Sequence, residues 1–545
     1  MILGTLTLDG VTTYVSNQEV AVEHFYLPYI AKIDNVSIRP EYQYGGLEIT
    51  EWGSISFSTR LWDNTNYNWP PSETATLTLK HTLTNEAGAT TIVSSANLVR
   101  VNDGDTALDV RYDIFINDIL GVDMLKTTNS ITARSTTSYE GIDTVLPMAV
   151  GTVVYQPPLR LNDYGGYPCY HSMYMTGTLD TDWHVYDDGV DICSNVTLGA
   201  GGTTGVGTFY LDYTAVGEVS ISGNGVFASG AAMATAIDDL VTCVTGEAVS
   251  VTDTYARTGD AKIGDFVESQ VSIQKYLSKL CASHAHFIKF TSSTVMELVK
   301  IEKCFEPTST TYTDTKILPV AYNADSSRVR SVKTSWPYRE QVDEGGRVYV
   351  KEVTREATRT NSVYWDGTVT STSANKLINS AEDFDYNSGY NNADYLGGDM
   401  IRYGMFVSCV DTGSTSYVAA VDSGTQLTIA DDIFTSTYGY EIGYSFDRGQ
   451  DVNIESFSID ETTILDNLKW IMNILHQRKA YVSIPFDSDE FLSIFTEGVY
   501  TIETNRLERV TQLYHNKIIG IIYDFEDEVV TYTISGSVYE ENPLT

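Results

Sequence analysis

The segment IQKYLSKLCASHAHFIKFTSSTVMELVKI, residues Ile273 to Ile301, changes its hydrophobic pattern partway along. Its first part carries apolar residues at the spacing of one helix face, at Ile273, Tyr276, Leu277, Leu280 and Cys281. Two strand-like runs follow, 286–290 and 295–301, with a short turn between them. The segment therefore predicts a helix followed by a β-hairpin, with the helix lying against the sheet.

A second segment repeats the order of helix and then strand. Its helical stripe consists of Ile464, Leu465, Leu468, Ile471, Met472 and Leu475, and the strand that follows is 480–485. Asp460 is the expected N-cap, and His476, Arg478 and Lys479 are expected at the negative C-terminal end of the helix. A further stripe, at Met233, Ile237, Leu240, Val241 and Val244, predicts a third helix. Each stripe is expected to face a core.

Most of the remaining sequence is typical of β structure. Apolar and polar residues alternate in Gly4–Leu8, Ser54–Ser58, Ala75–Leu79, Gln426–Ala430 and Thr531–Ser535. The pairs Asp103-Gly104, Asp188-Gly189 and Asp366-Gly367 are turn signals. The predicted fold class is mainly β with α+β layers.

The 545 residues are enough for three to five domains. Proline pairs, glycine-dense stretches and a Ser/Thr/Gly/Asn/Tyr-rich stretch suggest where they divide. The expected domains are an N-terminal β domain (1–156), a second β domain (157–228), an α+β helix–hairpin domain (229–310), a C-terminal domain in two parts (311–362 and 447–545), and a small β module (363–446) inserted into a surface loop.

The charge balance narrows the classes of partner. The chain has 72 Asp and Glu against 34 Lys and Arg, which gives a formal net charge of −38. Binding to a nucleic-acid backbone or to an anionic membrane needs a basic face, so neither is expected. Six cysteines without a CxxC pair indicate reduced, mostly buried thiols. The N-terminus does not look like a signal peptide, and no apolar run is long enough for a membrane helix.

Two groups of candidate binding residues also have simpler structural explanations. The glycine-rich segment Gly199–Gly207 lacks the lysine and the helix of a phosphate-binding loop, so a flexible loop is favoured. Cys281, His284 and His286 offer metal-ligand atoms, but the sequence around them lacks a second ligand pair, which favours a helix end and a strand.

An aspartate-rich stretch offers oxygen ligands for Ca²⁺, at Asp180, Asp182, Asp187, Asp188 and Asp191. Val185 stands where an EF-hand loop requires glycine, so hairpin-turn chemistry is favoured. The acidic runs Asp487–Glu490 and Asp524–Asp527 supply carboxylates whose separation in space a sequence does not give. We therefore predict no catalytic, cofactor-binding or metal-binding residues, no cofactor and no enzymatic activity.

Several phrases, in their order along the chain, resemble the tail hub (baseplate hub or tail-tip) proteins of long-tailed bacteriophages. They are Gly53–Leu61, Asn68–Pro71, Leu146–Tyr155, Val185–Val190, Gly207–Leu211, Gly217–Gly223, the helix–hairpin of 269–301, Ile518–Phe525 and Val530–Gly536. The resemblance covers most of 40–310 and 450–540. The inserted module is similar instead to small β decorations of phage structural proteins.

This resemblance implies a structural virion protein built from tube-like β-barrel domains. It implies a homotrimeric ring at the distal end of the tail tube, which contacts the distal tail or tube protein ring, the tape measure protein and a central fibre or spike, and whose lumen passes DNA. Assembly would take place in the host cytoplasm. Two helix-then-strand units per chain would let three subunits match a sixfold tube.

Two readings of another class remain open. The first is a host-surface protein that binds carbohydrate through the inserted module, at Tyr386, Tyr390, Asp394, Tyr395, Tyr417, Tyr438 and Tyr440. The second is a carbohydrate-active enzyme built on β domains, for which the sequence favours no carboxylate pair.

Overall fold

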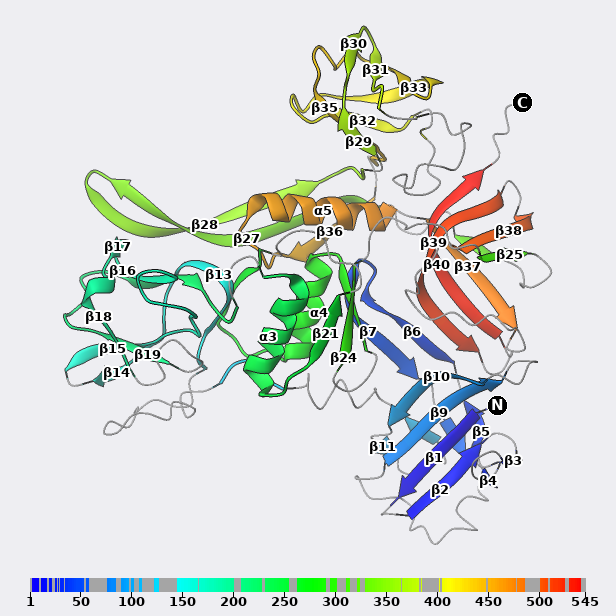
Figure 1. Cartoon of the computed structure of the whole chain (residues 1–545), viewed down its shortest axis with the longest axis horizontal. Helices are drawn as coiled ribbons and strands as arrows, with labels where there is room; N and C mark the ends of the chain where they lie inside the picture. The colour runs from blue at the N-terminus through cyan, green and yellow to red at the C-terminus, as the bar shows by residue number, and fades with distance from the viewer. Residues whose placement is uncertain are drawn as a thin grey trace.

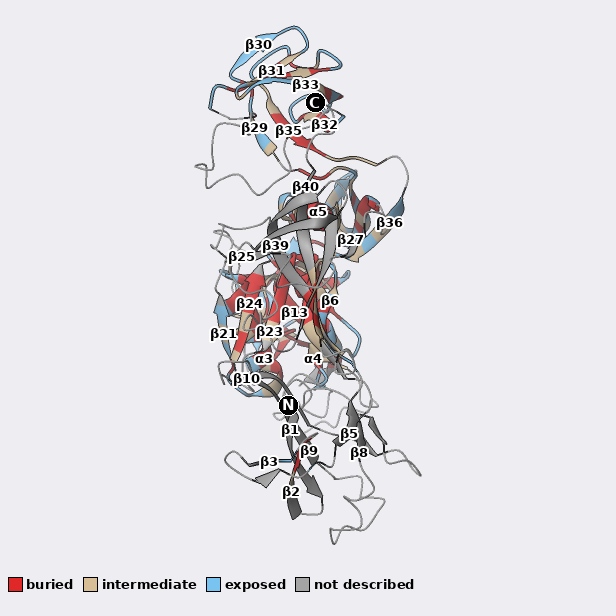
Figure 2. Cartoon of the chain, turned by 90° about the vertical axis from the view of Figure 1, so that its right-hand side faces the viewer, coloured by how far each residue is buried: buried red, intermediate tan, exposed pale blue. Residues whose placement is uncertain are grey.

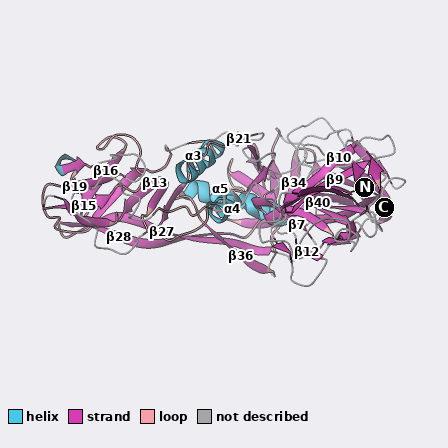
Figure 3. Ribbon diagram, turned by 90° about the horizontal axis from the view of Figure 1, so that it is seen from below, coloured by secondary structure: helices cyan, strands magenta, loops and turns pink. Residues whose placement is uncertain are grey.

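The computed structural model confirms a mainly β chain of several sheets. It describes residues 2–8, 11–16, 19–21, 25–26, 28, 30–33, 35–52, 55–57, 76–84, 90–97, 100–101, 107–109, 122–126, 145–164, 166–199, 207–227, 231–253, 262–290, 295–300, 310–313, 321–323, 329–363, 365–381, 384, 401, 404–446, 449–476, 478–485, 500–507, 510–524 and 529–540. The α-helices of this described part are α3 (Met233–Thr245), α4 (Ile273–Ser283) and α5 (Glu461–His476). They lie in the middle of the molecule, with strands on both sides (Figure 3).

The three helices form where the sequence predicts them. Every stripe residue of α3 and α4 is buried in one apolar cluster. Helix α4 begins at Ser272, whose side chain accepts a hydrogen bond from the Lys275 N–H, and α3 ends at Gly246, which has a φ of +76°. Asp460 caps α5 as expected, because its Oδ2 accepts from the Thr463 N–H at 2.9 Å.

Helix α5 differs from the prediction in two respects. Leu465, expected on the buried stripe, is 41% exposed, whereas Asn467 and Asn473 are buried. Arg478 and Lys479 lie in the next strand rather than in the last helical turn. His476 is in that turn, but burial lowers its pKa to about 4, so at neutral pH it is no cation. Its Nε2–H donates instead to the Val329 carbonyl at 2.8 Å.

One large sheet, called here the central sheet, joins segments from the beginning, middle and end of the chain (Figure 1). Its main order is β21-β24-β23-β7-β6-β39-β40-β37-β26, and β38 and β25 branch from β39. The strands are β6 (Val36–Tyr42), β7 (Gly45–Trp52), β21 (Ser250–Asp253), β23 (His286–Phe290), β24 (Val295–Lys300), β25 (Thr310–Thr313), β26 (Ala321–Asn323), β37 (Arg478–Pro485), β38 (Tyr500–Leu507), β39 (Val510–Asp524) and β40 (Val529–Glu540). The pairings among the described residues leave this sheet open rather than closed into a barrel.

Two smaller sheets pack face to face as a sandwich. One has the order β17-β16-β20-β13-β22 and the other β14-β15-β19-β18. Their shared core includes the fully buried Trp183 and Phe209. The strands are β13 (Met148–Gln156), β14 (Arg160–Tyr164), β15 (Tyr167–His171), β16 (Trp183–Asp187), β17 (Val190–Asp191), β18 (Val196–Leu198), β19 (Thr208–Leu211), β20 (Val219–Asn224) and β22 (Gly264–Val267), with a 3₁₀ turn η2 (Cys193–Asn195).

Strand β13 belongs to two cores at once. Ala149 and Val153 face the core of the sandwich, while Met148 and Val150 join the cluster around α3 and α4. Successive side chains of a strand point to opposite faces, so a strand between two layers must be apolar on both. Strand β13, which ends at the boundary expected after residue 156, pairs with β20 and β22, both of which follow it in the chain.

A long two-stranded ribbon projects from the middle of the chain toward the sandwich (Figure 1). It consists of β27 (Val329–Glu344) and β28 (Arg347–Arg359), joined by a Gly345-Gly346 turn with φ values of +65° and +83°. The first half of β27 also pairs with β36 (Gln450–Glu455). Helix α5 packs on β27 and β28, rather than on the strand that follows it in sequence.

The segment expected as an inserted module has a sheet of its own. Its order is β29-β35-β32-β33-β34-β31-β30. The strands are β29 (Trp365–Thr368), β30 (Ser371–Ser373), β31 (Lys376–Ile378), β32 (Phe406–Cys409), β33 (Thr415–Ser423), β34 (Gln426–Ile429) and β35 (Gly439–Gly443). The chain enters and leaves side by side, since the Ser362 N–H donates to the Tyr444 carbonyl at 2.9 Å. Asp366-Gly367 is not the expected turn but part of β29, where Gly367 allows the Tyr440 ring to approach closely.

The N-terminal part contributes further small sheets. Their orders are β10-β9-β1-β2, β11-β12-β8-β5 and β3-β4. The strands are β1 (Ile2–Leu8), β2 (Val11–Ser16), β3 (Val20–Ala21), β4 (Phe25–Tyr26), β5 (Ile30–Ile33), β8 (Ile55–Phe57), β9 (Thr76–Thr84), β10 (Thr90–Asn97), β11 (Arg100–Val101) and β12 (Ala107–Asp109). The module lies at one end of the molecule and these sheets at the other, and many of the described residues in the part between them are buried (Figure 2). Among the described residues, the helices are too short or too polar to cross a membrane.

Candidate metal centre

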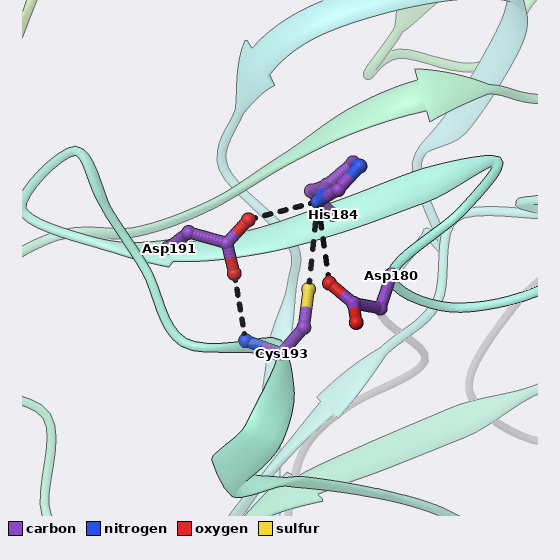
Figure 4. A group of neighbouring side chains, drawn as sticks. All are labelled: Asp180, His184, Asp191 and Cys193. Carbon is purple, nitrogen blue, oxygen red and sulfur yellow. Dashed lines mark hydrogen bonds and ion pairs between the residues drawn. The ribbon is translucent and has the colours of Figure 1, made fainter.

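Four side chains with metal-ligand atoms meet at one edge of the sandwich (Figure 4). They belong to Asp180, His184, Asp191 and Cys193, and their ligand atoms all lie within 4.8 Å of one another. His184 Nδ1 is the centre of the group. It lies 2.8 Å from Asp191 Oδ2, 3.8 Å from Cys193 Sγ and 4.0 Å from Asp180 Oδ1.

The hairpin β16–β17 brings these residues together. Trp183 and Val185 are fully buried, so His184 between them must point to the opposite face of the strand. The turn at Asp188-Gly189 has φ values of +51° and +80°, which sets Tyr186 opposite Asp191. His184 and Asp191 are then diagonal neighbours on one face of the hairpin.

Backbone hydrogen bonds hold two of the four ligand groups. The Val185 N–H donates to Cys193 Sγ at 3.3 Å, and the Cys193 N–H donates to Asp191 Oδ1 at 2.9 Å. Burial, with the neighbouring Asp191 carboxylate, raises the pKa of the Cys193 thiol to about 11. Burial alone would also raise the pKa of Asp191, but the hydrogen bonds from Cys193 and His184 hold it below its ordinary value.

Only part of the aspartate-rich stretch joins this group. Asp180 and Asp191 do, whereas the other three aspartates organise turns, as the sequence favours. Asp182 accepts from the Thr178 N–H at 2.6 Å, and Asp187 accepts from the Val216 and Gly217 N–H groups at 2.9 and 2.7 Å. Asp188 occupies the hairpin turn.

Sequence reasoning missed His184 and Cys193. The signal was present, because the Asp188-Gly189 turn and the two-residue alternation of β16 together put His184 on the face of Asp191. Cys193 gave no comparable signal, since it lies in the 3₁₀ turn after β17, whose direction the local sequence does not set.

The Cys281, His284 and His286 group has the structural roles that the sequence favours. Cys281 is buried in α4, and burial raises its pKa well above the ordinary value. His284 is the C-cap of α4 rather than a strand residue, and its Nδ1 lies 3.0 Å from the Leu280 carbonyl oxygen. His286 starts β23, and its Nδ1 lies 2.7 Å from the His284 carbonyl oxygen. These local contacts direct the two rings to backbone groups.

Other candidates fall partly or wholly outside the described residues. These are 200–206 of the glycine-rich loop, 487–490, 525–527 and the positions Tyr386, Tyr390, Asp394 and Tyr395. Within the described part of the module, Tyr440 is fully buried and Tyr438 packs against the module core. Tyr417 is 49% exposed. Tyr440 therefore has no face free for a sugar.

No protein-family model and no curated protein matches the chain. Among solved structures, the 43 kDa tail protein of prophage MuSo2 from Shewanella oneidensis aligns over 98% of this chain and 96% of its own, with 7% identity and a TM-score of 0.38. The tail protein from Neisseria meningitidis MC58 aligns over 73% of this chain and 94% of its own, with 8% identity and a TM-score of 0.29.

A chain of the phage p2 virion baseplate in its activated conformation aligns over 98% of this chain and 99% of its own, with 7% identity and a TM-score of 0.25. These structures are described as a prophage tail protein, a tail protein and a virion baseplate. TM-scores at this level leave the chain without a fold-family assignment.

Proposed function

We propose that this chain is a structural protein of a phage tail, and that three copies form the hub ring at the distal end of the tail tube. The observation that carries the proposal is the position of the two helix-then-strand units. Strand β23 follows α4 and strand β37 follows α5, and both strands belong to the central sheet, although α4 packs on β7 and β23 of that sheet while α5 packs on β27 and β28. Three such chains supply six units around one axis, which is the number that a sixfold tube presents.

The connectivity of the central sheet supports a structural role for this chain in the tail. Strands β6 and β7, near the N-terminus, lie between β23 and β39, so the sheet forms only when distant parts of the chain have come together. Strands paired over such separations tie distant parts of the chain into one sheet, and such long-range pairings form slowly during folding. A ring that links the tube to a central fibre or spike needs a body of this kind.

The ion pairs support a lumen that DNA can pass without adhering. Several of the described basic side chains are paired with carboxylates, including Arg330 and Lys333 with Asp451, at 2.5 and 2.9 Å, and Arg339 with Glu218, at 2.7 Å. A Lys or Arg side chain that is already paired with a carboxylate contributes less to the counterion release that holds proteins on nucleic acid.

The proposed partners are the distal tail or tube protein ring, the tape measure protein and the fibre or spike, with DNA only in transit.

The proposal places the chain in the virion tail after assembly in the host cytoplasm, and it assigns no enzymatic reaction to it. The inserted module is proposed as a decoration of the ring. Among the described residues, its ion pairs with the body lie at its base, where Arg359 pairs with Glu441, and Lys469 pairs with Asp366 at 2.7 Å. The body can therefore keep its pairings when the module is removed.

Deletion of the module separates a hub from a host-binding protein. In the variant, residues 365–443 are replaced by a short Gly/Ser linker, because Ser362 and Tyr444 already lie side by side. We expect the variant to assemble to the same number of subunits as the intact chain and to enter tails normally. The measurements are light scattering and complementation of tail assembly, with Tyr417→Ala as the control for the exposed module surface. Normal tails that fail to adsorb to the host would support the carbohydrate-binding reading instead.

A further inference from the structure

We propose that Asp180, His184, Asp191 and Cys193 form a binding site for one Zn²⁺ ion. This site is independent of the tail-hub proposal, because it rests on the local geometry of the β16–β17 hairpin. The four residues come from the turn before β16, from β16 itself, from β17 and from η2. An ion among them would link the start of the β16–β17 hairpin to its end and to η2.

The distances are close to those of a tetrahedral site. In such a site, neighbouring nitrogen and oxygen ligands lie about 3.3 Å apart, and sulfur and nitrogen about 3.6 Å apart. His184 Nδ1 to Cys193 Sγ is 3.8 Å, and His184 Nδ1 to Asp180 Oδ1 is 4.0 Å. His184 Nδ1 to Asp191 Oδ2 is 2.8 Å, a hydrogen bond that would lengthen slightly when both atoms turn to a common ion. The four ligand atoms all lie within 4.8 Å of one another, so the most widely separated of them must approach by up to about 1.5 Å to reach a common ion.

Two backbone hydrogen bonds hold ligand groups of this cluster in position. The Val185 N–H is directed at Cys193 Sγ, and the Cys193 N–H is directed at Asp191 Oδ1. Donors of this kind orient the side chains that contact a metal and stabilise the negative charge of a metal-bound thiolate and carboxylate. His184 and Asp191 are half-exposed, with 33% and 45% of their side-chain surface accessible, so the ion has a path from solvent.

The donor set selects the kind of ion. Ca²⁺ and Mg²⁺ prefer sites built from oxygen alone, whereas a thiolate and an imidazole favour Zn²⁺ and similar transition metals. On binding, a Zn–S bond replaces the S–H bond of Cys193, and the proton leaves to solvent. Two carboxylates and one thiolate then face a doubly charged cation, which removes most of the repulsion among them.

The ion would fix a hairpin whose turn contacts the long ribbon. The Gly189 carbonyl accepts from Gln341 Nε2 at 3.0 Å, and Asp188 lies 3.7 Å from Arg347. Both contacts join the β16–β17 turn to β27 and β28. Binding at the base of this hairpin therefore stabilises the attachment of the ribbon to the sandwich.

The test uses the intact chain, freed of metal with a chelator and then titrated with Co²⁺ as a spectroscopic probe for Zn²⁺. We expect one equivalent to bind with a sulfur-to-cobalt charge-transfer band and the visible bands of tetrahedral Co²⁺, and Zn²⁺ to displace it. Cys193→Ser should abolish the sulfur band. His184→Ala should weaken binding by more than the roughly 10–100-fold that is lost when a residue that only supports a metal ligand is changed. The control is Cys243→Ser, a cysteine outside the group, which should leave both unchanged.

Circular dichroism of each variant checks that it folds. A sulfur band that persists in Cys193→Ser, or a Co²⁺ affinity equal in the intact chain and in His184→Ala, would overturn the proposal. Displacement of Co²⁺ by Ca²⁺ at equal concentration would overturn the choice of ion. Binding of fewer than about one half equivalent by a fully folded, metal-free protein would show that the four residues do not form a site.

Discussion

Gly151→Ala is expected to open strand β13 and both cores that it joins. Gly151 has a φ of +68°, and a Cβ built on it would lie 2.1 Å from the Ile263 carbonyl oxygen. A left-handed conformation costs a residue with a side chain about 1–2 kcal/mol, and a forced contact in a packed core costs about 1–3 kcal/mol more. The neighbouring backbone cannot give way easily, because the Thr152 N–H donates to that same carbonyl at 2.9 Å.

Hydrogen–deuterium exchange of 148–156 measures the effect locally, which suits a chain of several cores. We expect exchange in this strand to be at least roughly 30-fold faster in Gly151→Ala, since the two costs add to about 2–5 kcal/mol and every 1.4 kcal/mol is about tenfold. The matched control is Gly246→Ala. Gly246 also has a positive φ, of +76°, but nothing lies within 4 Å of its Cβ position. If exchange of 148–156 changed equally in the two variants, the contact with the Ile263 carbonyl would not destabilise the strand.

Asn473→Ala is expected to loosen the attachment of the module to α5. Asn473 is 1% exposed, and its side chain makes two hydrogen bonds to the same buried residue. Its Oδ1 accepts from the Val363 N–H at 2.6 Å, and its Nδ2 donates to the Val363 carbonyl at 2.8 Å. Removing the amide leaves two buried backbone groups without these partners, at about 1–3 kcal/mol each.

Limited proteolysis and exchange at 360–365 test this prediction, together with the thermal midpoint of the intact chain. We expect faster cleavage near the junction and a lower free energy of local opening by about 3 kcal/mol. Asp466→Ala serves as the control, because Asp466 is an exposed residue on the same helix. If Asn473→Ala behaved like Asp466→Ala at this junction, the two hydrogen bonds would not hold the module.

Local patterns predicted the helices and many strands, because those depend on neighbouring residues. The stripes of α3 and α4 and the N-cap of α5 are examples, as is the hairpin turn at Asp188-Gly189. The sheet order was not predictable in the same way. β6 and β7 join β39 and β23, and these pairings depend on contacts hundreds of residues apart.

The errors have physical causes that lie outside the local sequence. Leu465 is exposed because the packing partner of α5 is the narrow ribbon of β27 and β28, which covers only part of the helix. Asp366-Gly367 is in a strand because the glycine makes room for Tyr440, a partner distant in sequence. In the candidate metal centre, His184 could be placed from the hairpin register, but Cys193 required the path of the chain after β17.

The mass of the intact chain in solution tests the central claim most directly. We would measure it by light scattering at moderate and at high salt, since high salt screens the repulsion among chains that each carry a formal charge of −38. The hub account predicts a particle of three chains, three times 60.2 kDa, and a ring by negative-stain imaging. A particle of 60.2 kDa at both salt concentrations, and still in the presence of the ring at the end of the tail tube, would contradict it.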